Sequence, residues 1–155
     1  MSIDTKSGKP IAYLWEELNW HPSPKQLEQF IKLQSLLKYW NTQTNLTRLI
    51  HGNDYWIGQV FDSLWPLKEE LQKPSKELLC VDVGSGCGFP GLAVAIALTG
   101  SKILLIDSIS KKTAILKEIT NELDLSARIT IVTQRIESIG QDSNFREKFD
   151  LAMAR

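Results

Sequence analysis

The most informative part of the sequence is residues 78–91, which read Leu78-Leu79-Cys80-Val81-Asp82-Val83-Gly84-Ser85-Gly86-Cys87-Gly88-Phe89-Pro90-Gly91. An apolar run of strand-forming residues ends at four glycines within eight residues, and the apolar segment 92–98 follows at once. Glycine lets the chain turn sharply and brings bare backbone against a ligand, which a Cβ atom would obstruct. The order strand, glycine loop, helix is typical of the ligand-binding edge of doubly wound α/β domains.

Two ligand classes use such a loop. Gly86-x-Gly88-x-x-Gly91 fits the dinucleotide pattern, but there the first glycine should close the strand directly, and Gly86 comes three residues after Val83. Gly84-x-Gly86-x-Gly88 starts as the strand ends and therefore fits S-adenosylmethionine-dependent methyltransferases better. A turn without a ligand is the structural alternative, and the density of glycines disfavours it.

Composition bounds the remaining possibilities. The 155 residues suffice for one α/β domain and a small extension, and 43% hydrophobic with 23% charged residues is ordinary for a soluble globular protein. The N-terminus has no signal-peptide core and no apolar run approaches a membrane span, so we expect a cytoplasmic protein with no membrane association. Eighteen basic and eighteen acidic residues balance, so any RNA contact requires a local patch.

The first half of the chain predicts helices. Residues 1–10 should be loosely attached, and residues 11–20 form a short amphipathic segment. Ser23-Pro24-Lys25-Gln26 predicts a helix start with a capping box, and the helix continues to Asn41. A third helix should begin near Asn53 or Asp54, bury Ile57, Val60, Phe61 and Leu64, and end or kink at Pro66. We therefore divide the chain into a helical extension, residues 1–76, and an α/β domain, residues 77–155.

The second half predicts alternating strands and helices. The expected strands are 78–83, 102–107, 128–133 and 149–154, and a helix spans 110–123 between the second and third. Right-handed crossovers make this sheet parallel. A last strand at 149–154 would leave an apolar sheet edge unpaired, so we expect these residues to be the first part of a longer α/β domain.

Several side chains are expected at the ligand-binding edge. Asp107 ends the second strand about 20 residues after the loop, where a carboxylate usually holds ribose hydroxyls, and its alternative role is to cap the next helix. Asp82 could face a methionyl amine or accept backbone hydrogen bonds, and the sequence leaves both open. Ile136 and Glu137 follow the third strand, where an adenine would stack. Arg155 ends the fourth strand with a planar donor fork.

The sequence contains no obvious catalytic set. Neither a His/Cys/Asp cluster with metal spacing nor a Ser-His-Asp set is present, and the fourth strand lacks an Asn-Pro-Pro-aromatic motif. We therefore expect no metal and no catalytic side chain, and an acceptor that is already nucleophilic. The lone pair of guanine N7 qualifies, because it needs no general base and only requires alignment and desolvation.

Four motifs of the second half, together with short segments upstream, resemble one family. The sequence is similar to the bacterial 16S rRNA guanine-N7 methyltransferases of the glucose-inhibited division protein B family. The similar stretches are residues 81–91, 105–112, 135–137 and 153–155, and upstream Tyr39-Trp40-Asn41, Asn45-Leu46-Thr47 and Phe61-Asp62-Ser63. The resemblance covers the chain from about Pro24 onward. It implies a Rossmann-like class I methyltransferase sheet with an N-terminal helical extension, S-adenosyl-L-methionine as cofactor, and 16S rRNA in the small ribosomal subunit as partner of a monomeric enzyme.

The resemblance also implies site residues. Gly84, Gly86 and Phe89 would line the cofactor site. Its ribose end would hold Asp107, Ser108 and Ile109. Ile136 and Glu137 would hold the adenine, and Arg155 would complete the pocket.

Two departures from the family bear on these expectations. Gln59 stands where the family usually has histidine, so the role of that position is open, and the family continues beyond its Arg-Ala motif. A nicotinamide oxidoreductase and a non-catalytic cofactor-binding fragment remain as alternatives.

Overall fold

A computed structural model describes residues 11–155, so the expectation for residues 1–10 lies outside the described residues. Four parallel strands form one sheet in the order β3-β2-β1-β4. The strands are β1 (Leu78–Val83), β2 (Ser101–Asp107), β3 (Ile129–Thr133) and β4 (Leu151–Ala154). They lie within two residues of the predicted bounds, which confirms the parallel α/β sheet.

The register of the strands places the ligand-binding edge. Val83 pairs with Ile106, and Ile106 pairs with Val132, so the carboxyl ends of β1, β2 and β3 reach the same edge of the sheet. The side chains of β2 are almost continuously buried, as is typical of a central strand with both faces covered. Side chains that follow these three strands therefore meet at one place.

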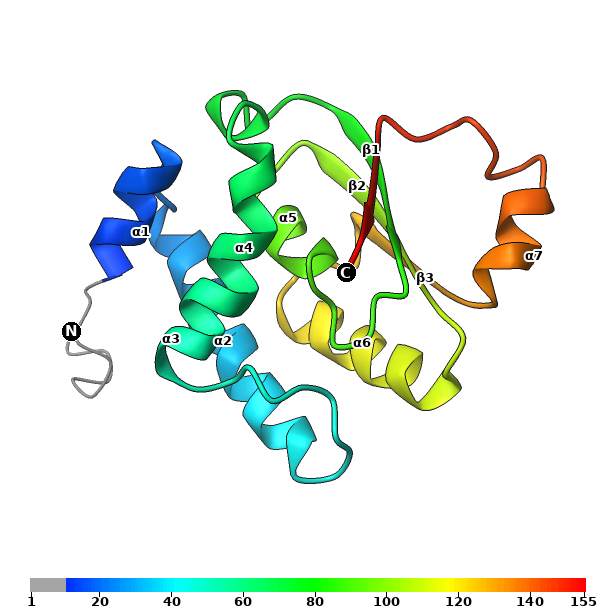
Figure 1. Cartoon of the computed structure of the whole chain (residues 1–155), viewed down its shortest axis with the longest axis horizontal. Coiled ribbons are helices and arrows are strands. Elements are labelled where there is room, and N and C mark those ends of the chain that lie inside the picture. Colours follow the sequence, from blue (N-terminus) through cyan, green and yellow to red (C-terminus); the bar gives the residue numbers. More distant parts are fainter. Residues whose placement is uncertain (1–10) are drawn as a thin grey trace.

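Helices cover the two faces unequally (Figure 1). α5 (Gly91–Ala97) and α6 (Ser110–Glu122) pack on one face, and α1 (Ile11–Leu18) and α2 (Pro24–Asn41) lie beyond them, while α7 (Ile136–Gln141) lies on the other side of the sheet. Every residue of α5 is buried. The helical extension therefore forms a second layer over α5 and α6.

The capping box predicted at the start of α2 is confirmed. The Ser23 hydroxyl accepts from the Gln26 backbone N–H at 3.2 Å, and the Gln26 side chain accepts from the Ser23 N–H at 2.8 Å. The Gln26 amide nitrogen also donates to the Ile96 carbonyl at 2.8 Å. One side chain thus starts α2 and fastens it to the end of α5.

The third helix differs from the prediction. It consists of α3 (Gly52–Tyr55), a π-helical turn η1 (Trp56–Phe61) and α4 (Asp62–Leu64), followed by the 3-10 turns η2 (Trp65–Leu67) and η3 (Glu70–Gln72). Ile57 and Phe61, predicted to face inward, are half-buried, whereas Gln59 is buried. The π turn is wider than an α turn, so buried positions recur every four residues. The buried set is Tyr55, Trp56, Gln59, Val60, Ser63 and Leu64.

The hydrophobic core is continuous across the two predicted parts. One cluster joins apolar side chains of the extension, such as Phe30 and Tyr55, to those of α5 and of the sheet face beneath it. A smaller cluster of Val81, Leu104, Ile106 and Ile139 lies on the other face. The boundary near residue 76 stays a prediction. Among residues 11–155, no helix combines the length and the apolar character that a membrane crossing needs.

Candidate functional site

The glycine loop between β1 and α5 has a left-handed backbone at three positions. Gly84, Gly86 and Gly88 have φ angles of +70°, +55° and +101°, which side-chain-bearing residues rarely adopt. Between them, the buried Ser85 hydroxyl donates to the Asp82 carbonyl at 2.9 Å and accepts from the Ile106 N–H at 3.1 Å. The loop is therefore fastened to the ends of both central strands.

Asp107 holds the other side of the loop. One carboxylate oxygen accepts from the Gly86 N–H and the other from the Ile109 N–H, both at 2.9 Å. The second bond supports the turn that leads into α6. The N-cap of α6 is Ile109, without a side-chain capping bond, so the capping alternative for Asp107 is wrong. Each ionised carboxylate oxygen can accept two hydrogen bonds, so Asp107 keeps capacity for hydroxyl donors.

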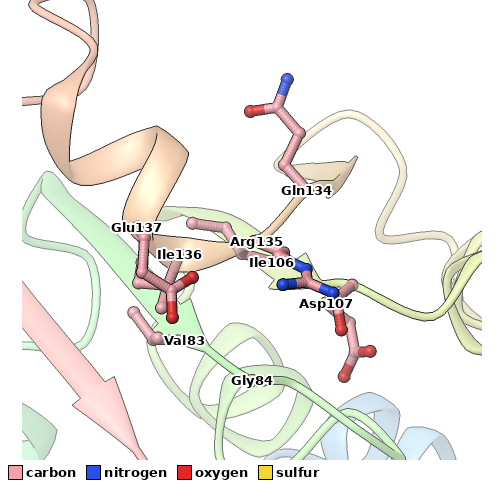
Figure 2. A pocket seen from close by; sticks show the side chains of 9 residues that line it. Val83, Gly84, Ile106, Asp107, Gln134, Arg135, Ile136 and Glu137 are labelled. Atoms are coloured by element: carbon pink, nitrogen blue, oxygen red, sulfur yellow. The ribbon is translucent and has the colours of Figure 1, made fainter.

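A cavity of about 360 Å³ opens at the carboxyl ends of β1, β2 and β3. Its lining consists of Val83, Gly84, Ile106, Asp107, Ser108, Gln134, Arg135, Ile136 and Glu137. Figure 2 shows Glu137 and Ile136 beside Val83, Asp107 across from them, and the Gln134 amide turned away. A Cβ atom on Gly84 would meet nothing within 4 Å, so the bare backbone there faces open space.

The cavity unites much of the predicted site. Gly84, Asp107, Ser108, Ile136 and Glu137 all line it, although they come from three separate strand ends. Its carboxylates suit hydroxyl and amino donors, and its aliphatic side chains suit a flat apolar ring. The chemistry of this lining is compatible with an adenosyl group.

Other predicted residues lie elsewhere. The Phe89 side chain is 3% exposed and packs edge-on against Tyr55 with ring centroids 6.1 Å apart, so it anchors the loop in the core. Ile109 is 48% exposed and lies outside the cavity lining. Gly86 supports the cavity from behind through its bond to Asp107. The Arg155 guanidinium donates to the Gly58 carbonyl at 2.9 Å and to the Gln59 side chain.

Asp82 lies beneath the loop and is fully buried. Its Oδ2 atom accepts from the Gly91 N–H at 2.9 Å, which confirms the backbone-acceptor alternative, while Oδ1 has no hydrogen-bond partner among the described residues. Burial raises the pKa of Asp82 to about 6, against the lowering effects of the Gly91 N–H and the Arg155 charge. A Cβ atom on Gly91 would press against Leu105 and come within 2.7 Å of Oδ2, which explains the glycine there.

Sequence reasoning left the role of Gln59 open and overlooked its partner Thr47. The Gln59 amide nitrogen donates to the Thr47 hydroxyl at 3.0 Å and to the Cys87 sulfur at 3.7 Å. No local sequence pattern predicts these contacts, because the partners lie 12 and 28 residues away in the chain. The one signal in the sequence was a glutamine between the apolar residues Ile57 and Val60 of the predicted third helix. The structure shows that this glutamine is buried.

Comparison with solved structures agrees with this fold. The methyltransferase domain of METTL16 superimposes with a TM-score of 0.53 at 15% identity over 96% of this chain and 66% of that chain. The N-terminal domain of human METTL16, solved in complex with SAH, gives a TM-score of 0.52 at 15% identity over 99% of this chain and 69% of that chain. At such identities the likeness concerns the fold alone, and it supports the Rossmann-like parallel sheet.

Sequence comparison is more specific. The chain is 54% identical over 155 residues to the ribosomal RNA small subunit methyltransferase G of Prochlorococcus marinus strain MIT 9313, covering 100% of this chain and 63% of the relative. It is 56% identical over 146 residues to the protein of that name from Parasynechococcus marenigrum strain WH8102, covering 94% and 59%. The chain thus spans about three-fifths of the length of these curated relatives. The family model GidB, rRNA small subunit methyltransferase G, matches residues 26–155, and the chain belongs to this family.

Proposed function

We propose that this chain carries the methyl-donor site of an enzyme that transfers a methyl group from S-adenosyl-L-methionine to N7 of a guanine in 16S rRNA of the small ribosomal subunit. The observation that carries the proposal is the cavity at the ends of β1, β2 and β3, where Asp107 is bonded to the glycine loop. Membership of the rRNA small subunit methyltransferase G family supports the same reaction.

Each predicted residue has a role in this proposal. Asp107 and Ser108 hold the ribose hydroxyls, with Ile109 at their outer border, and Ile136 and Glu137 hold the adenine. The backbone at Gly84 and Gly86 lies against the methionyl part, and Phe89 keeps that backbone in place from the core. Arg155 completes the site from the β4 side of the loop.

The bound cofactor supplies a methyl group activated by a sulfonium centre. Guanine N7 presents a lone pair, so no side chain needs to remove a proton, and rate enhancement comes from alignment and exclusion of water. The glycine loop aligns the donor because Asp107 and Ser85 fix it to β2. The Oδ1 atom of Asp82, which has no hydrogen-bond partner among residues 11–155, is one buried acceptor below the loop for a donor group of the methionyl part.

Calorimetric titration tests the cofactor. S-adenosylmethionine should bind saturably to the chain and NAD should not, because the loop geometry and the family favour the methyl donor. Saturable binding of NAD alone would restore the oxidoreductase alternative and overturn this proposal.

Methyl transfer is tested separately with purified small ribosomal subunits and radiolabelled cofactor. Label at a guanine N7 of 16S rRNA supports the whole proposal. Cofactor binding without transfer supports the alternative of a non-catalytic cofactor-binding fragment. The proposal also includes that the enzyme acts in the cytoplasm and as a monomer. Light scattering on the purified protein tests the monomeric state.

A further inference from the structure

A polar junction lies on the side of the glycine loop away from the cavity. We call it the Gln59 junction, and its members are Thr47, Gly58, Gln59, Cys87 and Arg155. The Gln59 side chain is 1% exposed, yet its amide is used in full: the nitrogen donates to the Thr47 hydroxyl and the Cys87 sulfur, and the oxygen accepts from Arg155. The neighbouring Gly58 carbonyl accepts from Arg155 at 2.9 Å. The junction therefore joins the extension, the loop and the end of β4.

The backbone around Gln59 is unusual. Gln59 lies in the π-helical turn Trp56–Phe61, and such turns are rare and recur at functional sites. The wide turn buries Gln59 in line with Tyr55, whose ring packs on Phe89 of the loop. An ordinary α turn would have placed Gln59 at a different angle around the helix. The π turn thus aims this amide at the loop.

The other anchor of the junction is also held firmly. Asn41 donates to the Thr47 carbonyl at 2.7 Å and accepts from the Leu46 and Thr47 N–H groups at 2.9 and 3.2 Å. The Thr47 hydroxyl therefore stands on a fixed turn when it accepts from Gln59. Since Thr47 is fixed, Gln59 can hold the loop in one position.

The loop tip is consequently held from two sides. Cys87 is in contact with Gln59, and the adjacent Gly86 N–H is bonded to Asp107 at the cavity. Gln59 itself does not line the cavity. We infer that Gln59 is a positioning residue, which sets the tip of the glycine loop against Asp107 for methyl-donor binding. The binding part of this inference rests on the proposed function.

The test uses substitutions that separate position from size. Gln59→Met keeps the length of the side chain and removes the donor and the acceptor, whereas Gln59→His keeps one of each. Gln29→Met is the matched control, because the Gln29 amide also ties the extension to the α/β layer, donating to the Leu123 carbonyl at 2.7 Å far from the loop. Thr47→Val, which removes the hydroxyl partner, is a second variant should Gln59→Met fail to fold.

Two readouts are measured well below the unfolding temperature. Calorimetry should show S-adenosylmethionine affinity reduced about tenfold in Gln59→Met, equivalent to about one hydrogen bond, and near wild type in Gln59→His and Gln29→Met. Alkylation of Cys87 by iodoacetamide is mapped by mass spectrometry, with the buried Cys80 as internal reference. It should be about tenfold faster in Gln59→Met than in wild type, and unchanged in Gln59→His and Gln29→Met. Thr47→Val should change both readouts in the same direction.

The two readouts distinguish the ways of failing. If Gln59→Met only lowers the unfolding temperature, with wild-type affinity and wild-type Cys87 alkylation, Gln59 is structural and the inference is wrong. If wild-type protein binds no S-adenosylmethionine while Cys87 alkylation still responds to Gln59→Met, the proposed function fails and the positioning of the loop stands.

Discussion

Replacing Asp82 with asparagine separates the electrostatic cost of this buried carboxylate from its role in packing. Burial raises the pKa of Asp82 from 3.8 to about 6, so the folded protein holds this proton more tightly than the unfolded chain. The stabilisation of the folded state by this proton is complete below the pKa that Asp82 has in the unfolded chain. It is lost as pH rises through the pKa that Asp82 has in the folded protein. The shift of about 2 pKa units corresponds to about 3 kcal/mol, of which about 2 kcal/mol falls between about pH 4.5 and 7.5.

The measurement is urea unfolding of wild type and Asp82→Asn across that pH range. The free energy of unfolding of the variant minus that of wild type should rise by about 2 kcal/mol from about pH 4.5 to 7.5. A constant offset between the two is also expected, because the new amide N–H groups replace an oxygen that has no partner within the described part of the chain. This offset does not vary with pH. A difference that stays flat with pH would refute the reasoning, whatever its mean value.

Further substitutions test the loop and its supports. Gly84→Ala, at φ +70°, should destabilise the protein by about 1–2 kcal/mol and weaken S-adenosylmethionine binding at least about tenfold in calorimetry. Gly140→Ala is the control and should leave the affinity unchanged, because a Cβ atom there, as at Gly84, meets no described atom within 4 Å. Gly91→Ala should lower the free energy of unfolding by about 1–3 kcal/mol in urea, because its methyl group meets the Asp82 carboxylate; unchanged stability would contradict this packing. Arg128→Met should destabilise by about 2 kcal/mol, because the guanidinium donates to the backbone carbonyls of Ala95 in α5 and Ser101 in β2. Wild-type cofactor affinity at low temperature is the accompanying check.

Local patterns in the sequence predicted much of the fold. The capping box at Ser23 and the alternation of buried strands with helices depend on residues close together in the chain, so they can be recognised without a structure. Asp107 was predicted by its place at the end of the second strand, and the parallel register then brings it to the loop. These features follow from short-range rules.

The remaining features depend on distant partners. The buried Gln59 amide in the π turn Trp56–Phe61 takes a hydrogen bond from Arg155, which is 96 residues away in the chain. Gly100 follows α5, which ends at Ala97, and a Cβ atom on this glycine would press against the carbonyls of Ser75 and Lys76. Its small size is thus required by packing between segments, which helix periodicity does not reveal.

The continuous core restricts how the extension can move. One hydrophobic core contains Phe30, Tyr55 and the side chains of α5. Moving the extension away from the α/β layer would therefore expose a large apolar area to water. A ligand therefore has to reach the cavity at the strand ends without displacement of the extension. The upper layer behaves as a fixed wall.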